Sequence, residues 1–534
     1  MPRDFRLRGI VEGFYGPPWT HEARREVLSF LAPRGMNAYV YAPKDDPFHR
    51  ARWREPYPYD EQRALGELAS FARALGVQFG FAISPGLDID YESPSDREQL
   101  EAKLSPLLDA GVEWVVLALD DIPLAPDLAP RQAALTTWLY GWLRDRRAAA
   151  QLTVCPTEYV GTRPSPYLGE LAAGVPDAVS LLWTGPTVCS PTITEADAAA
   201  WTAAVAPHAV ILWDNYPVND GTMSARLHLG PYEGRAPALA DRLGGVLLNP
   251  MTQPHASLVA LASAMAFLCD PDACDADAGW EAAIAAVGGD RHDSLRVLAH
   301  ACADGPLRAP AALELATLVT ALDEEAEGPG WASAARALSA ALRATKAALT
   351  DWPATDALAE EVAAWVAAGG REVAAALAAV RLLQGTRPVG VIEADGTGRA
   401  AAPDAEALLQ LVFGLVFAWS GARANREVVF GPRFVIYPAV VQTEDGRPAV
   451  DVGMTLWEDA NVVDWLSRIA LREYERWREA ADETVRVMVD GNERAVAADG
   501  TFDGRGAMAL LRSGRLVTRV RPGEELPMRD RRLP

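Results

Sequence analysis

Cysteine is scarce in this chain, and its spacing argues against a disulfide framework or a structural zinc site. The 534 residues include five cysteines, an odd number, and no Cys-x-x-Cys pair. A disulfide framework usually has an even number of cysteines, and a structural zinc site usually has closely spaced ones. The seven histidines are scattered, so no matched cluster indicates a transition metal. Reduced thiols are typical of cytoplasmic proteins, and we expect a cytoplasmic location. The cysteines are Cys155, Cys189, Cys269, Cys274 and Cys302.

The sequence also lacks a surplus of positive charge and a long apolar run. It carries 50 Lys and Arg against 72 Asp and Glu, which gives a formal net charge of −22. Charge of this sign disfavours nucleic acid and anionic membranes as partners, because both attract basic surfaces. A membrane-spanning helix needs about 18 apolar residues, and we find no such run free of charge. The N-terminal MPRDFRLRGIVEGFYG also lacks the apolar core of a secretory signal.

Residues 1–250 contain eight short apolar runs rich in Val, Ile and Leu, separated by segments with helical spacing. Alternating strands and helices favour a parallel sheet. Eight such units in this length predict a (β/α)8 barrel more readily than a doubly wound sheet, and no G-x-G-x-x-G or Walker A motif supports the latter. The runs are residues 8–14, 36–42, 77–83, 113–119, 152–157, 178–184, 209–214 and 244–249.

The composition changes twice after the predicted barrel. We expect a (β/α)8 domain over 1–270, followed by a helical bundle over 271–390 that is rich in Ala and Leu. Residues 391–534 mix strand-like runs with long helical stretches, and we expect a small mixed α/β domain of unknown role. The overall fold class is therefore α/β.

Polar and aromatic residues follow most of the predicted strands, where barrel enzymes place their chemistry. Asp120 and Asp121 form an adjacent pair, and their repulsion is expected to raise at least one pKa, as a general acid requires. By spacing alone the pair also suits a solvated turn. It also suits a Mg²⁺ site with four further carboxylates, Asp45, Asp46, Asp88 and Asp90.

Aromatic residues at the strand ends favour a sugar ligand, because their flat faces can pack against a pyranose ring. Nearby amide and charged groups could bind its hydroxyls. Trp183 fits a buried position equally well. The aromatic candidates are Tyr15, Tyr159, Trp183 and Trp213, and the polar candidates are Lys44, Asn215, Asp220 and Asn249.

The first half of the chain resembles the catalytic domain of glycoside hydrolase family 84, the O-GlcNAcases and related bacterial β-N-acetylglucosaminidases. The matching segments run in order from about residue 8 to about residue 265, and several are long and unusual. They are GIVEGFYGPPWT, YVYAPKDDPFHRARWREPY, FAISPGLDI, VLALDDI, CPTEYVGT, LLWTGP, ILWDNYPVND and LGPYEGR.

This resemblance implies a retaining exo-β-N-acetylglucosaminidase that uses the acetamido oxygen of its substrate as the nucleophile and forms an oxazoline intermediate. Asp120 would then orient the acetamido group and Asp121 would be the general acid and base. Tyr159 would hydrogen-bond the acetamido group, and Asn215 would support the same region. Trp213 would form the pocket wall. The sugar hydroxyls would be bound by Gly13 through its backbone, Lys44, Asp220 and Asn249.

The resemblance implies no metal and no cofactor, because the substrate brings its own nucleophile. The expected substrate is a glycoprotein or glycan that carries N-acetylglucosamine, and a homodimer through the helical domain stays open. One alternative is a hyaluronan- or chitin-type oligosaccharide hydrolase. A second is an inactive protein that binds N-acetylglucosamine, which the presence of both aspartates disfavours. A third, a metal-dependent hydrolase, would lose activity with a chelator.

Overall fold

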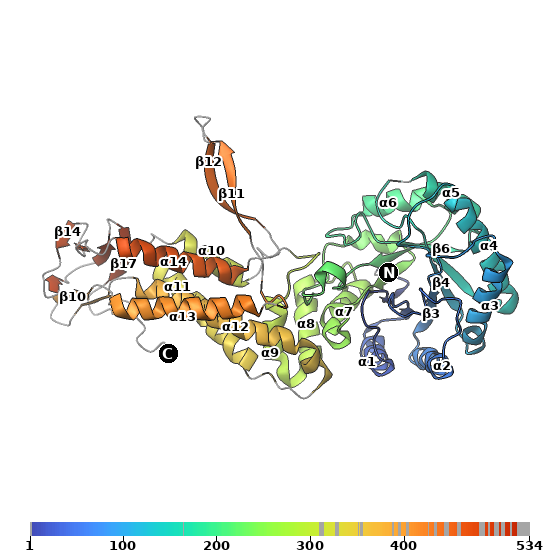
Figure 1. Cartoon of the computed structure of the whole chain (residues 1–534), viewed down its shortest axis with the longest axis horizontal. Coiled ribbons are helices and arrows are strands. Elements are labelled where there is room, and N and C mark those ends of the chain that lie inside the picture. Colours follow the sequence, from blue (N-terminus) through green and yellow to red (C-terminus); the bar gives the residue numbers. More distant parts are fainter. Residues whose placement is uncertain are drawn as a thin grey trace. The chain divides into compact units, whose positions relative to one another are not determined.

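Eight parallel strands close into a barrel in chain order, and each of the eight predicted runs overlaps one strand (Figure 1). The ring closes where β1 pairs with β8, with Ile10 opposite Leu248. The prediction of a (β/α)8 barrel is therefore confirmed. The strands are β1 (Arg8–Glu12), β2 (Ala38–Tyr41), β3 (Gln78–Ile83), β4 (Trp114–Ala118), β5 (Gln151–Cys155), β6 (Ser180–Trp183), β7 (Val210–Asp214) and β8 (Gly245–Leu248).

This computed structural model describes most of the chain. It covers residues 3–163, 165–308, 314–325, 330–350, 352, 356–386, 389–392, 397–401, 405–425, 427–431, 435–442, 448–455, 461–479, 486–489, 492–495, 501–503, 508–512 and 515–520.

Helices surround the barrel, and several begin at a residue that caps them. Ser93 and Ser165 accept backbone hydrogen bonds at the starts of α3 and α5. Thr194 forms a reciprocal capping box with Asp197 at the start of α6. The link from β7 to β8 holds two short 3-10 turns in place of an α-helix. The helices are α1 (His21–Leu31), α2 (Tyr59–Ala74), α3 (Pro94–Asp109), α4 (Leu128–Arg146), α5 (Pro166–Gly174), α6 (Glu195–Ala204), α7 (Pro254–Cys269) and α8 (Ala276–Gly288).

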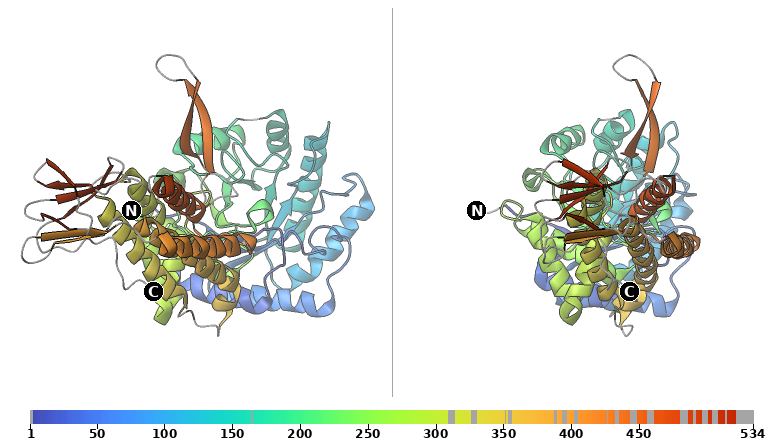
Figure 2. Two further views of the ribbon diagram at one scale, coloured as in Figure 1. Left: turned by 60° about the vertical axis from the view of Figure 1, so that its left-hand side comes forward. Right: turned by 90° about the vertical axis from the view of Figure 1, so that its left-hand side faces the viewer.

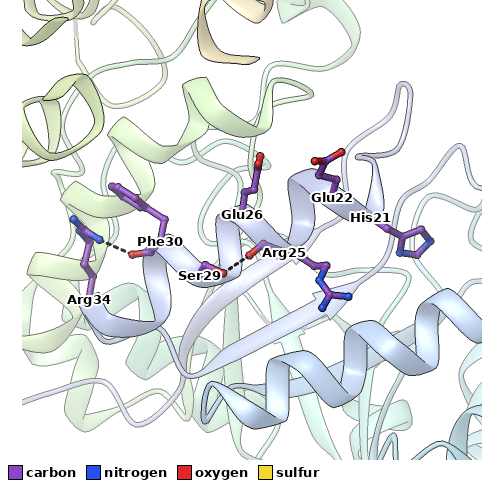
Figure 3. A pocket seen from close by; sticks show the side chains of 7 residues that line it. All are labelled: His21, Glu22, Arg25, Glu26, Ser29, Phe30 and Arg34. Atoms are coloured by element: carbon purple, nitrogen blue, oxygen red, sulfur yellow. Dashed lines mark hydrogen bonds between the residues drawn. The ribbon is translucent and has the colours of Figure 1, made fainter. Parts of the chain in front are cut away.

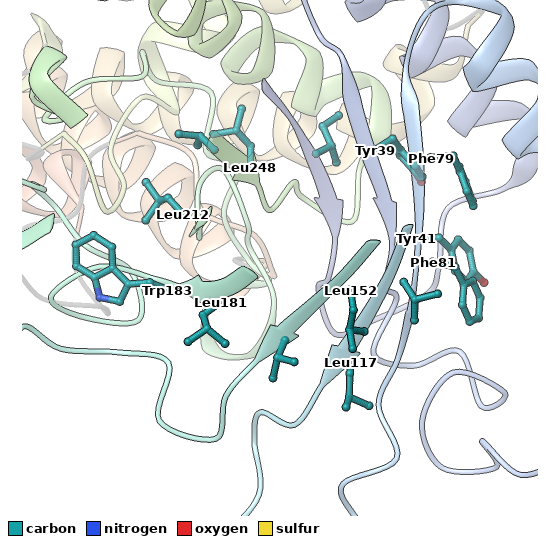
Figure 4. Packing of buried hydrophobic residues seen from close by; sticks show 14 of the residues in the cluster. Tyr39, Tyr41, Phe79, Phe81, Leu117, Leu152, Leu181, Trp183, Leu212 and Leu248 are labelled. Atoms are coloured by element: carbon teal, nitrogen blue, oxygen red, sulfur yellow. The ribbon is translucent and has the colours of Figure 1, made fainter. Parts of the chain in front are cut away.

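Both faces of the barrel strands are buried, which explains why their sequences are nearly continuous apolar runs. Successive side chains alternate between the interior and the helix layer. In β4, Trp114 and Val116 belong to the inner cluster, whereas Val115 and Leu117 belong to the outer one. Figure 4 shows part of that outer cluster, including Leu117. This packing fixes the strand ends, and the loops that follow them carry the site.

The described residues divide into two compact units. One comprises residues 1–292 and 303–308, and the other 293–302 and 309–534. Within the second unit, α12 packs against α11, α13 and α14, so these helices lie side by side (Figure 1 and Figure 2). The helices of this part are α9 (His292–Ala301), α10 (Glu314–Glu324), α11 (Trp331–Thr350), α12 (Ala357–Gly385), α13 (Ala405–Ala424) and α14 (Val462–Glu479). Our boundaries at 270 and 390 rest on composition and stay predictions.

Among the residues that the structure describes, the second unit also contains three small antiparallel sheets. β9 (Val389–Ile392), β10 (Thr397–Ala401) and β15 (Thr501–Asp503) form one, and β11 (Val435–Gln442) pairs with β12 (Pro448–Thr455). The third contains β13 (Arg486–Val489), β14 (Asn492–Ala495), β16 (Met508–Arg512) and β17 (Arg515–Val520). Strands and helices therefore both occur beyond residue 390.

One helix in the described part of the chain, α13, is long and apolar enough to cross a membrane by length and composition alone. Our sequence criterion missed it because Glu406 and Arg423 interrupt the run near its two ends. Core helices of soluble proteins pass the same test, and α13 packs against α12 and α14. It also exposes Phe413. The expectation of no membrane partner stays a prediction.

Candidate active site

A pocket opens among the loops that follow the barrel strands, and it contains all nine residues that the sequence analysis assigned to the site. Its volume is about 260 Å³, near the lower end of the range for small-ligand pockets. The loops after seven of the eight strands contribute to it, β3 being the exception. The nine residues are Gly13, Lys44, Asp120, Asp121, Tyr159, Trp213, Asn215, Asp220 and Asn249.

Asp120 lies just beyond β4 and is buried against the ammonium group of Lys44. The Lys44 Nζ to Asp120 Oδ2 distance is 2.5 Å, and both side chains are almost fully buried. The other oxygen, Oδ1, is buried and has no hydrogen-bond partner. Because a buried polar atom normally has a partner, this oxygen is an unsatisfied acceptor on a residue that lines the pocket.

Asp121 occupies the mouth of the same pocket. Its φ of 55° is in the left-handed region, which Asp tolerates better than most residues. Successive side chains of a strand point to opposite faces, and this departure from strand geometry lets two consecutive side chains reach one pocket. Tyr15 Oη donates to Asp121 Oδ2 at 2.7 Å, and Tyr159 Oη donates to Oδ1 at 2.9 Å. Burial and Asp121 raise the pKa of both phenols, so each remains a donor.

The pKa of Asp121 differs from our expectation. Burial acts to raise it, but the charge of Lys44, the hydrogen bonds from Tyr15 and Tyr159 and the charge of Arg50 hold the pKa of this carboxyl below its usual range. The expected rise from mutual repulsion is therefore wrong for Asp121. Nearby cations and donated hydrogen bonds favour the ionised form more strongly than one neighbouring carboxylate disfavours it.

The pocket wall is built by close packing between the ends of β1, β7 and β8. A Cβ atom added to Gly13 would lie 2.1 Å from Trp213 Cζ2, so only glycine fits there. Asn215 Oδ1 accepts from Trp213 Nε1 at 3.0 Å and from Asn249 Nδ2 at 2.9 Å. Asn249 Oδ1 in turn accepts from the Gly13 N–H at 3.2 Å. These contacts fix the indole of Trp213 as one rigid face of the pocket.

Asp220 follows β7 and lies at the rim. Its Oδ2 accepts from the Tyr15 N–H at 2.8 Å. Burial raises the pKa of Asp220, the Tyr15 N–H opposes that rise, and the charges of Asp121 and Asp45 add to it. The rim therefore carries a second carboxylate, next to the tyrosine that binds Asp121.

Several residues noted in the sequence lie outside the pocket. Trp183 is fully buried, its Nε1 donates to the Gly161 carbonyl at 2.9 Å, and its ring stacks on Trp201, so it is a core residue and not a sugar platform. Asp46 accepts hydrogen bonds from Tyr41 and Tyr57.

The other carboxylates of the magnesium alternative also have local partners. Asp88 accepts from Trp53 Nε1 and pairs with Arg54. Asp45 accepts from the Gly16 N–H, and Asp90 from the Glu92 N–H. They therefore stabilise loops and do not converge on Asp120 and Asp121, and the described residues contain no cluster of three or more metal-ligating side chains.

Sequence reasoning missed two kinds of residue. Arg50 contacts both Tyr15 and the backbone of Asp121, although it follows β2 by nine residues. Arg50 belongs to the segment KDDPFHR, which is part of the resemblance to the family. That membership was the one feature of the sequence that could have indicated a role for Arg50. Val188, Cys189 and Met223 also line the pocket, but no chemical pattern in the sequence distinguished them.

A second hollow lies along the outer surface of α1 and the turn after it (Figure 3). Several of its polar groups already have partners: Ser29 donates to the Arg25 carbonyl and Arg34 to the Phe30 carbonyl. His21 and Glu26 pair with Glu61 of α2 and His255 of α7. Because the lining comes from one stretch of chain, we assign the chemistry to the barrel pocket. The lining residues are His21, Glu22, Arg25, Glu26, Ser29, Phe30 and Arg34.

Comparison with known proteins connects this pocket to a family. A family model described as beta-N-acetylglucosaminidase matches residues 8–300, more than half of the chain. The chain is 37% identical over 270 residues to Protein O-GlcNAcase of Rattus norvegicus, and the match covers 48% of this chain and 29% of the relative. The protein of the same name from Mus musculus gives the same values. The chain thus spans less than a third of the length of these curated relatives.

Among solved structures, the chain is similar to a mutant of the O-GlcNAc hydrolase of Thermobaculum terrenum. The identity is 28% and the TM-score 0.69. The match covers 79% of this chain and 89% of that one, so the likeness extends beyond the barrel.

Proposed function

Because the chain belongs to the β-N-acetylglucosaminidase family of glycoside hydrolases, we propose that it removes terminal β-linked N-acetylglucosamine with retention of configuration. The proposed nucleophile is the acetamido oxygen of the substrate, and the proposed intermediate is an oxazoline. Substrate-assisted glycosidases are a recognised exception to the scheme in which an enzyme carboxylate attacks.

The observation that carries this proposal is the unpartnered oxygen of Asp120. Its Oδ1 is buried without a partner, while Oδ2 is fixed by Lys44. An acetamido N–H can donate to that oxygen, which would orient the acetamido carbonyl toward the anomeric carbon. The negative charge of Asp120 would then stabilise the positive charge that develops on the acetamido group as its oxygen attacks.

Asp121 supplies the proton in this scheme. This role requires that a bound sugar raise the pKa of Asp121 from its lowered position, because further burial of the carboxyl favours its neutral form. The acetamido oxygen forms a bond to the anomeric carbon while the bond from that carbon to the leaving oxygen breaks. The leaving oxygen takes the proton of Asp121 and departs as an alcohol. Asp121, now a carboxylate, then removes a proton from water as the water oxygen bonds to the anomeric carbon and the oxazoline ring opens. The acid and base are thus regenerated after each turnover.

The size of the pocket supports exo action. A volume of about 260 Å³ suits one sugar unit better than a polymer chain. This favours removal of a terminal residue over internal cleavage of hyaluronan or chitin. The names of the similar proteins, O-GlcNAcase and O-GlcNAc hydrolase, support a substrate in which N-acetylglucosamine is attached to protein. Cys155, Cys189, Cys269 and Cys274 form no disulfide, which supports the proposed cytoplasmic location.

The test is a series of aryl β-N-acetylglucosaminides whose acetyl group carries none, one, two or three fluorine atoms. Fluorine withdraws electrons from the carbonyl oxygen, so we expect kcat/KM to fall steeply along the series. The matching aryl β-glucoside, which lacks the acetamido group, should not be hydrolysed. Good turnover with a flat response to fluorine would instead indicate a nucleophile from the enzyme.

A further inference from the structure

Arg50 is a charged side chain that contacts Tyr15 and Asp121 at the pocket mouth, and the resemblance gave it no role. It lies in the loop between β2 and α2, and only 9% of it is exposed. One guanidinium nitrogen donates to Tyr15 Oη, and the other lies 3.5 Å from the Asp121 carbonyl oxygen. The remaining nitrogen, Nε, is buried without a hydrogen-bond partner, and the guanidinium carbon lies 5.4 Å from the centre of the Tyr15 ring.

The hydrogen bonds run in one direction, from Arg50 to Tyr15 to Asp121. The Tyr15 oxygen accepts from the guanidinium and its hydrogen is donated to Asp121 Oδ2 at 2.7 Å. A hydroxyl that accepts a hydrogen bond from a cation becomes a stronger donor, because consecutive hydrogen bonds polarise one another. The Tyr15 ring is 39% exposed, and its hydroxyl is directed by these two contacts.

We propose that Arg50 is a positioning residue that acts through Tyr15, holding the Asp121 carboxylate in the direction required for proton transfer at the pocket mouth. The second contact, to the Asp121 carbonyl, supports the left-handed backbone of that residue. This inference rests on the proposed function, because it assigns a partner to the proposed acid and base. Arg50 itself touches neither the sugar nor the reacting atoms in this scheme.

The role has a consequence for the pH dependence of the reaction. Arg50, Lys44 and the phenols all favour the ionised form of Asp121. Burial opposes the ionised form. The charges of the neighbouring carboxylates Asp120 and Asp220 act in the same sense as burial. Removing Arg50, or the hydroxyl through which it acts, therefore raises the pKa of Asp121. Because the acid must be protonated, the alkaline limb of the kcat/KM profile should move to higher pH.

The experiment measures that limb for Arg50→Gln, Tyr15→Phe and the double variant, with an alkyl β-N-acetylglucosaminide that needs acid assistance. Each single variant should shift the limb upward by about one pH unit, the scale of one hydrogen bond to a charged group. The double variant should shift it little further, because the two residues act in one chain. Arg50→Lys keeps the charge and should restore part of the shift.

Arg52→Gln is the matched control, because Arg52 stands in the same loop, is exposed and pairs with Glu55. The alkaline limb of the kcat/KM profile of Arg52→Gln should lie at the same pH as that of the wild type. An unchanged limb in both Arg50→Gln and Tyr15→Phe, with only uniformly lower rates, would overturn the role of Arg50 while leaving the proposed function intact. Tyr15→Phe keeps the ring, so this result is obtained even if Arg50→Gln fails to fold. If the wild type does not hydrolyse N-acetylglucosaminides, the proposed function fails and the role fails with it.

Discussion

Two adjacent aspartates acquire different surroundings from one change in backbone direction. Asp120 continues inward and is fixed by Lys44, whereas Asp121 turns to the mouth and accepts hydrogen bonds from two phenols. Groups of the same chemical type take separate roles when their environments separate their protonation. The buried carboxylate suits a fixed anion, and the one at the mouth can reach both a leaving oxygen and water.

Replacement of Asp121 tests the proposed division of roles. Asp121→Ala removes the proton donor, so kcat/KM for an alkyl β-N-acetylglucosaminide should fall about 10²- to 10⁴-fold, the usual contribution of a general acid. An aryl glycoside with a strongly acidic phenol needs little protonation and should lose far less. Steady-state kinetics on the two substrates gives the comparison.

Asp127→Ala is the control for that variant. Asp127 is exposed in the same loop and also has a positive φ, of 59°, so the backbone strain on introducing Ala is matched. Its kinetics should resemble the wild type. Asp120→Asn should slow both substrates alike, because the acetamido group is needed whatever the leaving group. Equal losses for both substrates in Asp121→Ala would contradict its role as the acid.

The sequence could predict which residue types line the pocket, but not how they interact. Asp120, Asp121 and Tyr159 follow predicted strands, and the carboxyl ends of barrel strands meet at one face. Arg50 lies well inside a loop, and its distance from Asp121 depends on the folded path of that loop. The lowered pKa of Asp121 was missed for the same reason, since Lys44 and both phenols come from other strand ends.

At the scale of elements, the apolar runs located the strands well, whereas the face to which a strand-end residue points was harder to predict. Glu12 and Gly13 are consecutive at the end of β1, yet they face opposite ways. Glu12 is buried in an ion pair with Arg24 of α1, and Gly13 faces the pocket. Trp183 at the end of β6 similarly points into the outer layer. Register within the barrel decides such cases, and one sequence does not define it.

Gly13 tests the packing between β1 and β7. Gly13→Ala would place a methyl group 2.1 Å from Trp213 Cζ2, so the indole must move. We expect KM for an aryl β-N-acetylglucosaminide to rise, because the displaced ring occupies the sugar position. The unfolding free energy should fall by about 1–3 kcal/mol, as is typical of overpacking. Kinetics and urea unfolding measure the two effects.

Gly141→Ala is the comparison for this effect. Gly141 lies in α4, and a Cβ added there meets nothing within 4 Å. This variant should keep wild-type kinetics and gain slightly in stability, because Ala favours helix more than Gly does. An unchanged KM in Gly13→Ala would show that the wall at Trp213 does not contact the sugar.

At the scale of the whole molecule, all nine predicted site residues fall between positions 13 and 249, within the barrel unit. The second unit is not needed to explain the pocket chemistry. Its amino-acid composition predicted its structure in less detail than the apolar runs predicted that of the barrel. Ala- and Leu-rich stretches predicted its helices. The exposed apolar side chains of α13, such as Phe417, had no counterpart in that prediction, because helical spacing alone does not show which face a neighbour covers.

Two buried neutral histidines make the stability of the molecule depend on pH. His49 and His228 direct Nδ1 toward the carbonyl oxygens of Ala82 and Val218, each at 2.8 Å. Burial lowers the pKa of His49 to about 3 and that of His228 to about 4, from an ordinary 6.5. Both histidines therefore stay neutral in the folded protein at pH values where the unfolded chain takes up protons.

The unfolding free energy should therefore be highest above about pH 6.5 and fall as the pH decreases toward 4, because over that range the unfolded state binds more protons. Each histidine contributes up to about 1.4 kcal/mol per pH unit in this window. Urea unfolding at pH 7, 6, 5 and 4.5 measures the slope. His228→Gln cannot take up the proton and should reduce that slope even if it lowers stability at pH 7. A slope equal to that of the wild type would show that His228 is protonated in the folded state.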